Sequence, residues 1–186
     1  MNKVQQEKDK LRKKILTLKK GYTQDELYYK SLEVLSIVEI TGIFQEAEKI
    51  FIYNNLKDEV HTLDFIRKWE QEKEFYLPVV DGDDLRFRRY SPSTGFQQSS
   101  YGIMEPIGED FTDYNKVDLV IVPGMAFDRR MNRMGRGRGF YDRLLPKLKA
   151  PRMGVCFDFQ LFDQIPIGGE KDIKMDYIVS ENDFMW

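Results

Sequence analysis

The chain has little sulfur or imidazole chemistry, because its 186 residues include one cysteine, Cys156, and one histidine, His61. A lone cysteine cannot form a disulfide within the chain, which suits a reducing compartment, and we predict a cytoplasmic protein. A histidine–cysteine zinc site needs several such ligands, and a serine or cysteine triad needs a histidine beside its nucleophile, so we expect neither. We interpret His61 as a surface or helix-start residue and Cys156 as a small buried apolar side chain.

Long apolar runs and an excess of either charge are also lacking. No apolar run approaches the roughly 20 residues of a membrane helix, and residues 1–8 lack the apolar core of a signal peptide. With 29 lysines and arginines against 31 acidic residues, the net charge is -2, whereas a general nucleic-acid binder carries a basic excess. We expect one domain over residues 1–186 that binds small molecules, without a nucleic-acid or membrane partner; we expect a monomer, although a dimer stays open.

Hydrophobic spacing and turn residues predict helices that alternate with strands. The predicted helices span 3–20, Thr23 to near Gly42, 64–69, and Tyr141 to about Leu148. The predicted strands span 49–54, 75–80, 85–90, 117–122, 152–157 and 177–180. We expect residues 85–90 to form an edge strand and residues 91–108 to be mostly loop. The alternation predicts an α/β fold with a largely parallel sheet, whose ligands bind beyond the carboxyl ends of the strands.

A glycine–arginine segment, residues 123–143, follows the predicted strand at 117–122. Five arginines lie between positions 129 and 138, where guanidinium groups could fork onto phosphate oxygens. Its central glycines are spaced two residues apart: Gly135, Gly137 and Gly139. A loop between a strand and a helix presents free backbone N–H groups to phosphate, although this one matches neither a P-loop nor Gly-x-Gly-x-x-Gly. We interpret the segment as a polyphosphate site; a flexible solvated loop and an RNA-contacting Arg–Gly element are the alternatives.

Two aspartates near this segment are candidates for binding a metal ion. Asp142 lies in the first turn of the predicted helix, where a carboxylate either interacts with the helix dipole or holds magnesium that bridges nucleotide phosphates. Asp172, before the final predicted strand, could supply a second oxygen ligand. Alone, each carboxylate is a cap or a surface charge. Because histidine and cysteine are too few for zinc, we expect a hard, oxygen-ligated ion, which selects magnesium.

Further candidate residues come from other segments. Lys8 and Arg12 share one face of the first helix, for which a solvated face is the ordinary interpretation. Asn54 lies at the carboxyl end of the first strand. Glu59 follows it and could cap a helix or accept N–H groups of a polar heterocycle. Four aromatic residues either pack in the core or stack on a flat ring: Phe127, Phe140, Tyr141 and Phe157.

The sequence from Asn132 to Arg143, with Pro123-Gly124 and Ala126-Phe127-Asp128, resembles the signature of the 5-formyltetrahydrofolate cyclo-ligase family, also called methenyltetrahydrofolate synthetases. The similarity covers nearly the whole chain and includes Lys8, Leu11-Arg12, Asp58-Glu59, Phe157 to Gln160, Ile165-Pro166 and Asp172 to Asp176. The resemblance implies a Rossmann-like three-layer fold with helices on both faces of the sheet. It also implies conversion of 5-formyltetrahydrofolate to 5,10-methenyltetrahydrofolate, with ATP as cosubstrate and Mg²⁺ as cofactor.

The resemblance also implies roles by position. It implies ATP contacts from Lys8, Arg12, Arg133, Met134, Gly135, Arg136, Gly137, Arg138, Gly139, Phe140 and Tyr141. It implies folate contacts from Asn54, Glu59, Arg136, Gly137, Arg138, Gly139 and Phe140. Asp142 and Asp172 would hold magnesium, and Arg136 and Arg138 would be catalytic. In the implied mechanism the formyl oxygen attacks the γ-phosphorus of ATP to give an iminium phosphate, a step that needs charge neutralisation.

The chain departs from the family pattern at four positions of the segment. Met131 stands where glycine is usual, Met134 where leucine is usual, Phe140 where tyrosine is common, and Arg138 where glycine or lysine occurs. Phe140 keeps an aromatic ring but lacks the hydroxyl. Two other functions stay open at this point. An RNA- or nucleotide-binding module would bind less tightly as salt rises, and an isomerase or transferase of phosphorylated metabolites would not consume ATP.

Overall fold

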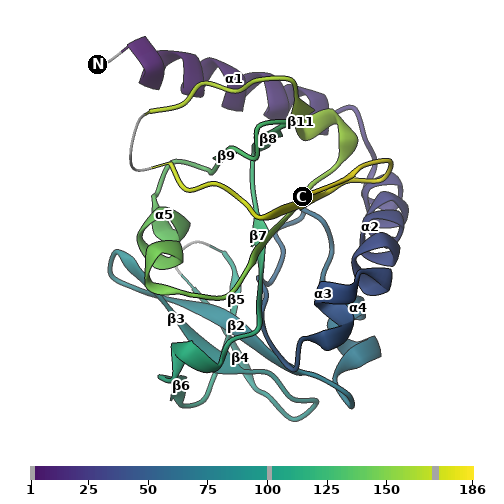
Figure 1. Cartoon of the computed structure of the whole chain (residues 1–186), viewed down its shortest axis with the longest axis vertical. Helices are drawn as coiled ribbons and strands as arrows, with labels where there is room; N and C mark the ends of the chain where they lie inside the picture. Colours follow the sequence, from purple (N-terminus) through teal and green to yellow (C-terminus); the bar gives the residue numbers. More distant parts are fainter. Residues whose placement is uncertain (1–2, 100–101, 169–171) are drawn as a thin grey trace.

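The computed structural model describes residues 3–99, 102–168 and 172–186 (Figure 1). Its helices are α1 (Lys3–Lys19), α2 (Gln24–Ile40), α3 (Gly42–Glu46), α4 (Leu63–Trp69) and α5 (Phe140–Leu144), with 3-10 turns η1 (Tyr114–Lys116), η2 (Leu145–Lys147) and η3 (Asp158–Gln160). Its strands are β1 (Lys49–Phe51), β2 (Glu74–Asp81), β3 (Asp84–Arg89), β4 (Phe96–Gln98), β5 (Met104–Pro106), β6 (Asp110–Phe111), β7 (Leu119–Pro123), β8 (Ala126–Asp128), β9 (Arg133–Met134), β10 (Arg152–Val155), β11 (Leu161–Phe162), β12 (Tyr177–Val179) and β13 (Phe184–Met185). In this described part of the chain, no helix has the length and apolar character needed to cross a membrane.

The main sheet has eight strands in the order β13-β12-β10-β7-β1-β2-β3-β6. The central strands β2, β1, β7, β10 and β12 are parallel, and antiparallel strands extend the sheet at both edges. The chain adds β2 on one side of β1 and then β7 on the other, so the strand order reverses between β1 and β7. Ligands of open α/β sheets bind at such a reversal, in the crevice beyond the carboxyl ends of the strands.

Helices cover both faces of the sheet, because side chains of the parallel strands alternate between two apolar cores. On one face Ile50 and Ile121 pack with residues of α2, α3 and α4. On the other face Phe51 and Val120 pack with Leu144 of α5. Figure 1 shows α2, α3 and α4 on one side of the sheet and α5 on the other. The predicted three-layer, Rossmann-like α/β fold is therefore confirmed.

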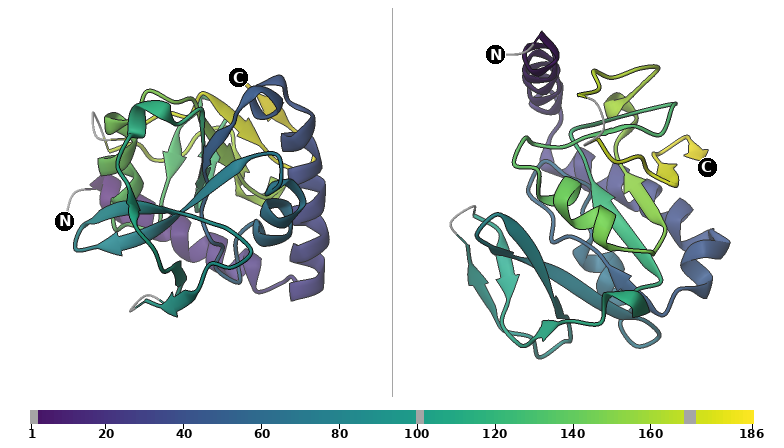
Figure 2. Two further views of the ribbon diagram at one scale, coloured as in Figure 1. Left: turned by 90° about the horizontal axis from the view of Figure 1, so that it is seen from below. Right: turned by 60° about the vertical axis from the view of Figure 1, so that its left-hand side comes forward.

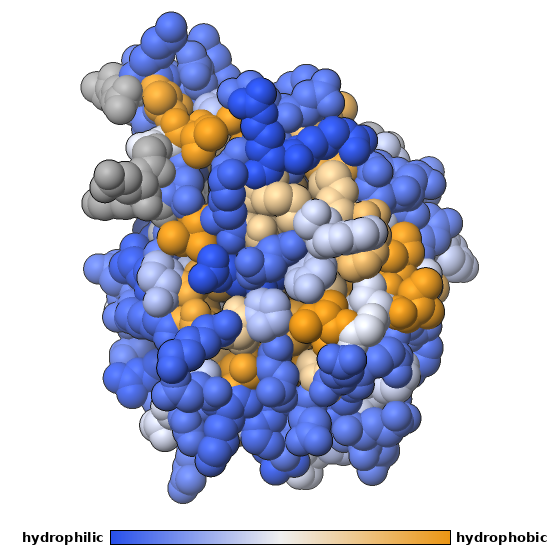
Figure 3. Space-filling view, in the orientation of Figure 1, coloured by the Kyte–Doolittle hydropathy of each residue, from blue (hydrophilic) through white to orange (hydrophobic). Residues whose placement is uncertain are grey.

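α1 lies outside these layers. Its Ile15 packs with Met125, Ala126 and Met134 beside a second sheet, which has the strand order β11-β8-β9. Figure 2 shows α1, in purple, at one end of the molecule and the teal strands β2 to β5 at the other. The face seen in Figure 3 is mostly hydrophilic, and hydrophilic residues separate its apolar areas.

Local sequence signals account for the start of α2 and for its end. The Thr23 hydroxyl accepts a hydrogen bond from the Glu26 N–H (3.2 Å), and the Glu26 carboxylate accepts one from the Thr23 N–H (2.7 Å), which forms a capping box at the predicted start of this helix. The Thr41 hydroxyl donates to the Val38 carbonyl (2.7 Å) and accepts from the Phe44 N–H (3.4 Å). One residue thus ends α2 and starts α3, a helix that we did not predict.

Several predictions about short elements are wrong. β3 is not an edge strand, since Phe87 and Arg88 pair with β6 on its outer side. Residues 91–108 are mostly loop, as predicted, but they also contain the hairpin of β4 and β5, which we did not predict. β13 follows the strand that we predicted as the last. The helix starting at Phe140 ends at Leu144 and continues as η2, where Pro146 has no backbone N–H to donate. Elements of two to five residues are too short to show a hydrophobic period.

Two glycines make room for a buried ring between the sheets. Phe127 of β8 is fully buried. A Cβ atom on Gly124 would lie 2.5 Å from this ring, and one on Gly154 of β10 would lie 2.4 Å from it. Both distances are far below van der Waals contact, so a residue with a Cβ atom at either position would clash with the Phe127 ring.

We expect Gly154→Ala to lower the free energy of unfolding by about 2 kcal/mol, because an added methyl group overpacks a core that cannot expand. Urea unfolding followed by circular dichroism measures this change. The matched control is Gly42→Ala in α3, where a Cβ atom would meet nothing within 4 Å. That variant should be as stable as the parent or slightly more stable. Equal losses in the two variants would contradict the packing argument.

Candidate active site

A cavity of about 310 Å³ lies at the strand reversal, beyond the carboxyl ends of β1 and β7. Segments after β1 and β7, parts of β2, β3 and β5, and the glycine–arginine segment all contribute to its wall. The lining residues are Tyr53, Asn54, Leu56, Glu59, Pro78, Val80, Leu85, Ile103, Glu105, Pro123, Gly124, Arg133, Gly135, Arg136, Arg138, Gly139, Phe140, Tyr141 and Asp142. A volume of this size is typical of small-molecule sites.

Most of the residues predicted for the site lie in this wall: Asn54, Glu59, Arg133, Gly135, Arg136, Arg138, Gly139, Phe140, Tyr141 and Asp142. Lys8, Arg12, Gly137 and Asp172 lie outside the wall. Met134 differs, because its side chain is buried in the core beside Ile15, and its carbonyl accepts a hydrogen bond from the Met125 N–H (2.8 Å). Of the aromatic candidates, Phe127 and Phe157 are fully buried in the apolar cores.

Arg133 is a buried support of the cavity wall. Its Nε donates to the Pro123 carbonyl at the end of β7 (2.8 Å), and its Nη1 pairs with Asp142 of α5 (3.3 Å). The guanidinium carbon lies 5.0 Å from the centre of the Tyr141 ring. Burial lowers the pKa of Arg133, although the charge of Asp142 opposes this effect, and burial raises the pKa of Tyr141. A buried cation is tolerated only when it is paired, and Asp142 supplies the opposite charge. Through its two contacts Arg133 connects the end of β7 to α5.

Arg136 contacts two acidic residues that follow β1. Its Nε donates to Glu59 (2.9 Å) and its Nη2 to Asp58 (2.6 Å), while Asp58 also pairs with the buried Lys19 at the end of α1 (3.1 Å). Burial lowers the pKa of Arg136, but the charges of Glu59 and Asp58 outweigh burial, so this pKa is raised. Two cations and two carboxylates balance in this cluster, which fixes the Arg136 guanidinium in the cavity wall.

Two side chains of α1 contact the segments around the cavity, so the solvated-face interpretation of Lys8 and Arg12 is wrong. The Arg12 Nε donates to the Gly135 carbonyl (3.0 Å), and a Cβ atom on Gly137 would lie 3.4 Å from the Arg12 guanidinium. The Lys8 Nζ lies 2.8 Å from both carboxylate oxygens of Asp172. These contacts hold α1 against the glycine–arginine segment.

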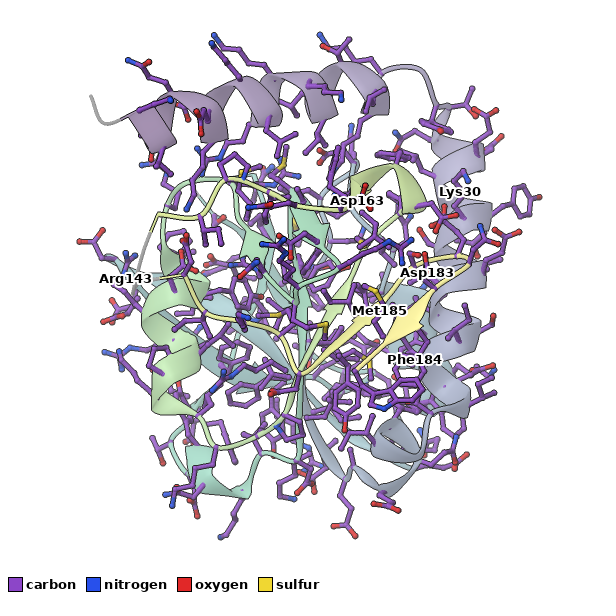
Figure 4. The ribbon with its side chains drawn as sticks, turned by 45° about the horizontal axis from the view of Figure 1, so that its top comes forward. Lys30, Arg143, Asp163, Asp183, Phe184 and Met185 are labelled. Atoms are coloured by element: carbon purple, nitrogen blue, oxygen red, sulfur yellow. The ribbon has the colours of Figure 1, made fainter. Side chains whose placement is uncertain are left out.

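The glycine–arginine segment contains β8 and β9 and is held by specific contacts, which argues against a flexible loop. Gly137 and Gly139 have φ angles of 103° and 71°, which residues with a side chain rarely adopt. Arg143 of α5, labelled in Figure 4, donates to the carbonyls of Asp83 (2.8 Å) and Arg138 (3.1 Å). A Cβ atom on Gly139 would lie 2.7 Å from Arg143, so glycine also leaves space for this bridge. We did not predict a role for Arg143.

A buried carboxylate fixes the turn between β8 and β9. Asp128 is fully buried and accepts hydrogen bonds from the backbone N–H groups of Arg130 (2.9 Å), Asn132 (3.0 Å) and Ile165 (3.0 Å), and from the Asn132 side-chain amide. Met131, inside this turn, has a φ of 69°. This left-handed conformation favours glycine, the residue that the family resemblance leads us to expect at this position.

The two predicted metal ligands each pair with a cation. Asp142 lies 3.3 Å from Arg133, and Asp172 lies 2.8 Å from Lys8. Both carboxylates lie near enough to Arg133 for their charges to oppose the effect of burial on its pKa. Across residues 3–99, 102–168 and 172–186, no three or more histidine, cysteine, aspartate or glutamate side chains gather as a metal site.

Asn54 and Glu105 belong to a different part of the cavity wall. The Asn54 Nδ2 donates to the Met104 carbonyl in β5 (2.8 Å). The next residue, Glu105, is buried, and its Oε1 accepts a hydrogen bond from the Val80 N–H of β2 (3.0 Å). Glu105 was not predicted, because it lies in a segment without a clear period; the available signal was one acidic residue between Met104 and Pro106.

A model of the 5-formyltetrahydrofolate cyclo-ligase family matches residues 4–181. The chain belongs to this family. A 5-formyltetrahydrofolate cyclo-ligase of Haemophilus influenzae is 33% identical over 131 residues, which cover 66% of this chain and 70% of that protein. The NMR structure of the Aquifex aeolicus 5,10-methenyltetrahydrofolate synthetase is 35% identical, with a TM-score of 0.85 over 95% of this chain and 91% of that one. The Mycoplasma pneumoniae synthetase structure, 23% identical with a TM-score of 0.74, covers 94% of this chain and 98% of its own and shares the cyclo-ligase fold.

Proposed function

We propose that this protein uses ATP and Mg²⁺ to convert 5-formyltetrahydrofolate into 5,10-methenyltetrahydrofolate. Membership of the cyclo-ligase family supports the folate substrate. The observation that carries the proposal is the cavity at the strand reversal, which joins apolar side chains of β2, β3 and Ile103 to arginines and glycines between residues 133 and 139. A flat pterin suits the apolar wall, and a triphosphate suits the cationic one.

The chemistry requires activation of the formyl oxygen, because the oxygen of a formamide is a poor leaving group. This oxygen attacks the γ-phosphorus of ATP, and ADP departs. The second folate nitrogen then adds to the carbon of the iminium phosphate and loses its proton, and phosphate leaves with the former formyl oxygen. Phosphoryl transfer of this kind depends on positioning and charge neutralisation more than on a protein nucleophile.

The glycine–arginine segment has the groups that these steps need. Arg136 and Arg138 line the cavity and would neutralise the charge on the transferred phosphoryl group. The Arg136 guanidinium is fixed by its hydrogen bond to Glu59 (2.9 Å), and the backbone carbonyl of Gly135 is fixed by the hydrogen bond that Arg12 donates to it (3.0 Å). Positioning of this kind lowers the barrier because the groups need not reorganise during the reaction.

Magnesium, when bound with ATP, supplies charge neutralisation and orientation of the phosphates. Asp142 and Asp172 would hold it, because both are carboxylates near Arg133 and each already accepts a cation. Binding of the metal would replace these ion pairs by metal contacts. The donor set of two carboxylates plus phosphate oxygens suits a hard cation.

We expect Asp142→Asn to raise the Mg²⁺ concentration for half-maximal activity by about tenfold or more, because an amide is a weaker ligand than a carboxylate. A magnesium titration at saturating ATP and folate measures this shift. Asp84→Asn removes an exposed partner of Lys147 (3.2 Å) and is the matched control, with no expected shift. An unchanged titration for Asp142→Asn would leave Asp142 as a partner of Arg133 and of the α5 dipole only.

The proposed function is tested by mixing the purified protein with Mg-ATP and 5-formyltetrahydrofolate and following the absorbance of methenyltetrahydrofolate. We expect product formation matched by release of ADP and phosphate. A folded protein that forms no product would contradict the proposal. Salt-sensitive RNA binding without turnover would favour the binding-module alternative. Turnover of a phosphorylated metabolite without ATP consumption would favour an isomerase or transferase.

A further inference from the structure

Glu105 is a buried carboxylate in the cavity wall that has no cation partner among the described residues. Its exposed fraction is 5%, and its Oε1 accepts a hydrogen bond from the Val80 N–H (3.0 Å). The other carboxylates of the wall, Glu59 and Asp142, pair with arginines at 2.9 and 3.3 Å. Within the same described ranges, Oε2 of Glu105 has no hydrogen-bond donor, so a ligand can supply one.

Apart from Asn54, the part of the wall to which Glu105 belongs is apolar. The neighbouring lining residues from β2, β3 and the hairpin of β4 and β5 are Pro78, Val80, Leu85 and Ile103. An ionised carboxylate in apolar surroundings costs free energy unless N–H groups or a cation compensate for its lost hydration. A flat ring that carries N–H groups on one edge fits both properties of this wall.

Three contacts hold Glu105 in position. Glu105 pairs with Gln97 in the antiparallel ladder of β4 and β5. The Asn54 side chain donates to the carbonyl of the neighbouring Met104 (2.8 Å), and the Val80 N–H donates to Glu105 itself. A carboxylate fixed in this way loses little conformational freedom when it binds a ligand. Asn54 thus acts on the same part of the wall as Glu105.

Building on the proposed function, we propose that Glu105 determines specificity for the pterin ring by accepting hydrogen bonds from its 2-amino group and N3–H. These two donors lie side by side, as the two oxygens of a carboxylate do. Oε2 and the second lone pair of Oε1 are available for them. Glu59, whose oxygens accept from Arg136 (2.9 Å) and from the Leu56 N–H (3.0 Å), then positions Arg136.

The test combines substitutions of Glu105 with a change in the ligand and compares the effects on binding. Dissociation constants are measured without ATP for 5-formyltetrahydrofolate and for its analogue in which a methyl group replaces the 2-amino group. We expect Glu105→Ala and Glu105→Gln to weaken binding of the parent folate about tenfold to a hundredfold, and binding of the analogue, which keeps only the N3–H donor, by a clearly smaller factor of about tenfold or less. Glu105→Gln keeps an acceptor for the Val80 N–H, so it tests the inference even if Glu105→Ala does not fold. The exposed Glu109→Gln is the control and should change neither constant.

Two outcomes would overturn this inference. Equal losses for both ligands would mean that Glu105 only supports the wall. If Glu59→Gln weakened binding of the parent folate more than binding of the analogue, and Glu105→Gln did not, then Glu59 would be the residue that binds the N–H edge of the pterin. Neither outcome affects the proposed function, which fails separately if the parent protein does not convert 5-formyltetrahydrofolate.

Discussion

Arg136→Ala should lower kcat/KM by about a hundredfold to a thousandfold while the protein stays folded. The guanidinium lines the cavity and is held by Glu59 at 2.9 Å and Asp58 at 2.6 Å, so its position is set before substrates bind. Its removal takes away a positive charge at the proposed phosphate site and leaves the carboxylates of Glu59 and Asp58 there, which would repel phosphates. Steady-state kinetics with ATP and folate varied in turn separate a loss in kcat from a rise in KM.

Two control variants make the Arg136 result specific. Arg129→Ala removes another arginine of the same segment, which pairs with Asp183 at 3.2 Å, and should leave the kinetics unchanged. Figure 4 shows Asp183 beside β13, on the other side of the molecule from Arg143 of α5. Arg136→Lys keeps the charge but cannot bond both acids in the same geometry, so we expect partial activity. Parental kinetics in Arg136→Ala would remove Arg136 from the mechanism.

Asp128→Ala should lower the free energy of unfolding by about 4 kcal/mol, because it leaves several buried N–H donors without an acceptor. The donors are the backbone N–H groups of Arg130, Asn132 and Ile165 and the side-chain amide of Asn132. Their nitrogen atoms lie 2.9 to 3.1 Å from the carboxylate oxygens. The turn that they form precedes Arg133, so the variant should also lose activity.

Urea unfolding followed by circular dichroism measures this loss of stability. Asp163→Ala is the control, because Asp163, labelled in Figure 4, is fully exposed and its only described ion pair, with Arg129, spans 3.7 Å. Exposed ion pairs contribute little, so we expect parental stability. A similarly small change in Asp128→Ala would mean that water replaces the carboxylate without loss.

The parts of the fold that the sequence predicts are those with local causes. The capping box of Thr23 and Glu26 acts over three residues, and the alternation of strands and helices follows from hydrophobic spacing, so both could be predicted. β4, β5, β8, β9 and β11 could not be predicted, because each has only two or three residues and shows no hydrophobic period. β11 also depends on pairing with the distant β8.

The same division applies to the candidate site. Spacing and family resemblance identified Arg136, Glu59 and Asp142, which the fold places in one cavity. The sequence could not show that Lys19 pairs with Asp58, or that Glu105 lies in the cavity wall. Both depend on how α1 and the hairpin dock against the rest of the chain.

Two residues of α1 have partners that come much later in the chain. The bond between Lys8 and Asp172 joins residues 164 positions apart, and the bond between Arg12 and Gly135 spans 123 positions. Contacts of such long range form slowly and only after the intervening chain is available. We therefore expect α1, and the cavity wall that Arg12 contacts at Gly135, to become fixed late in folding, and a chain cut before Gly135 would leave α1 without either contact.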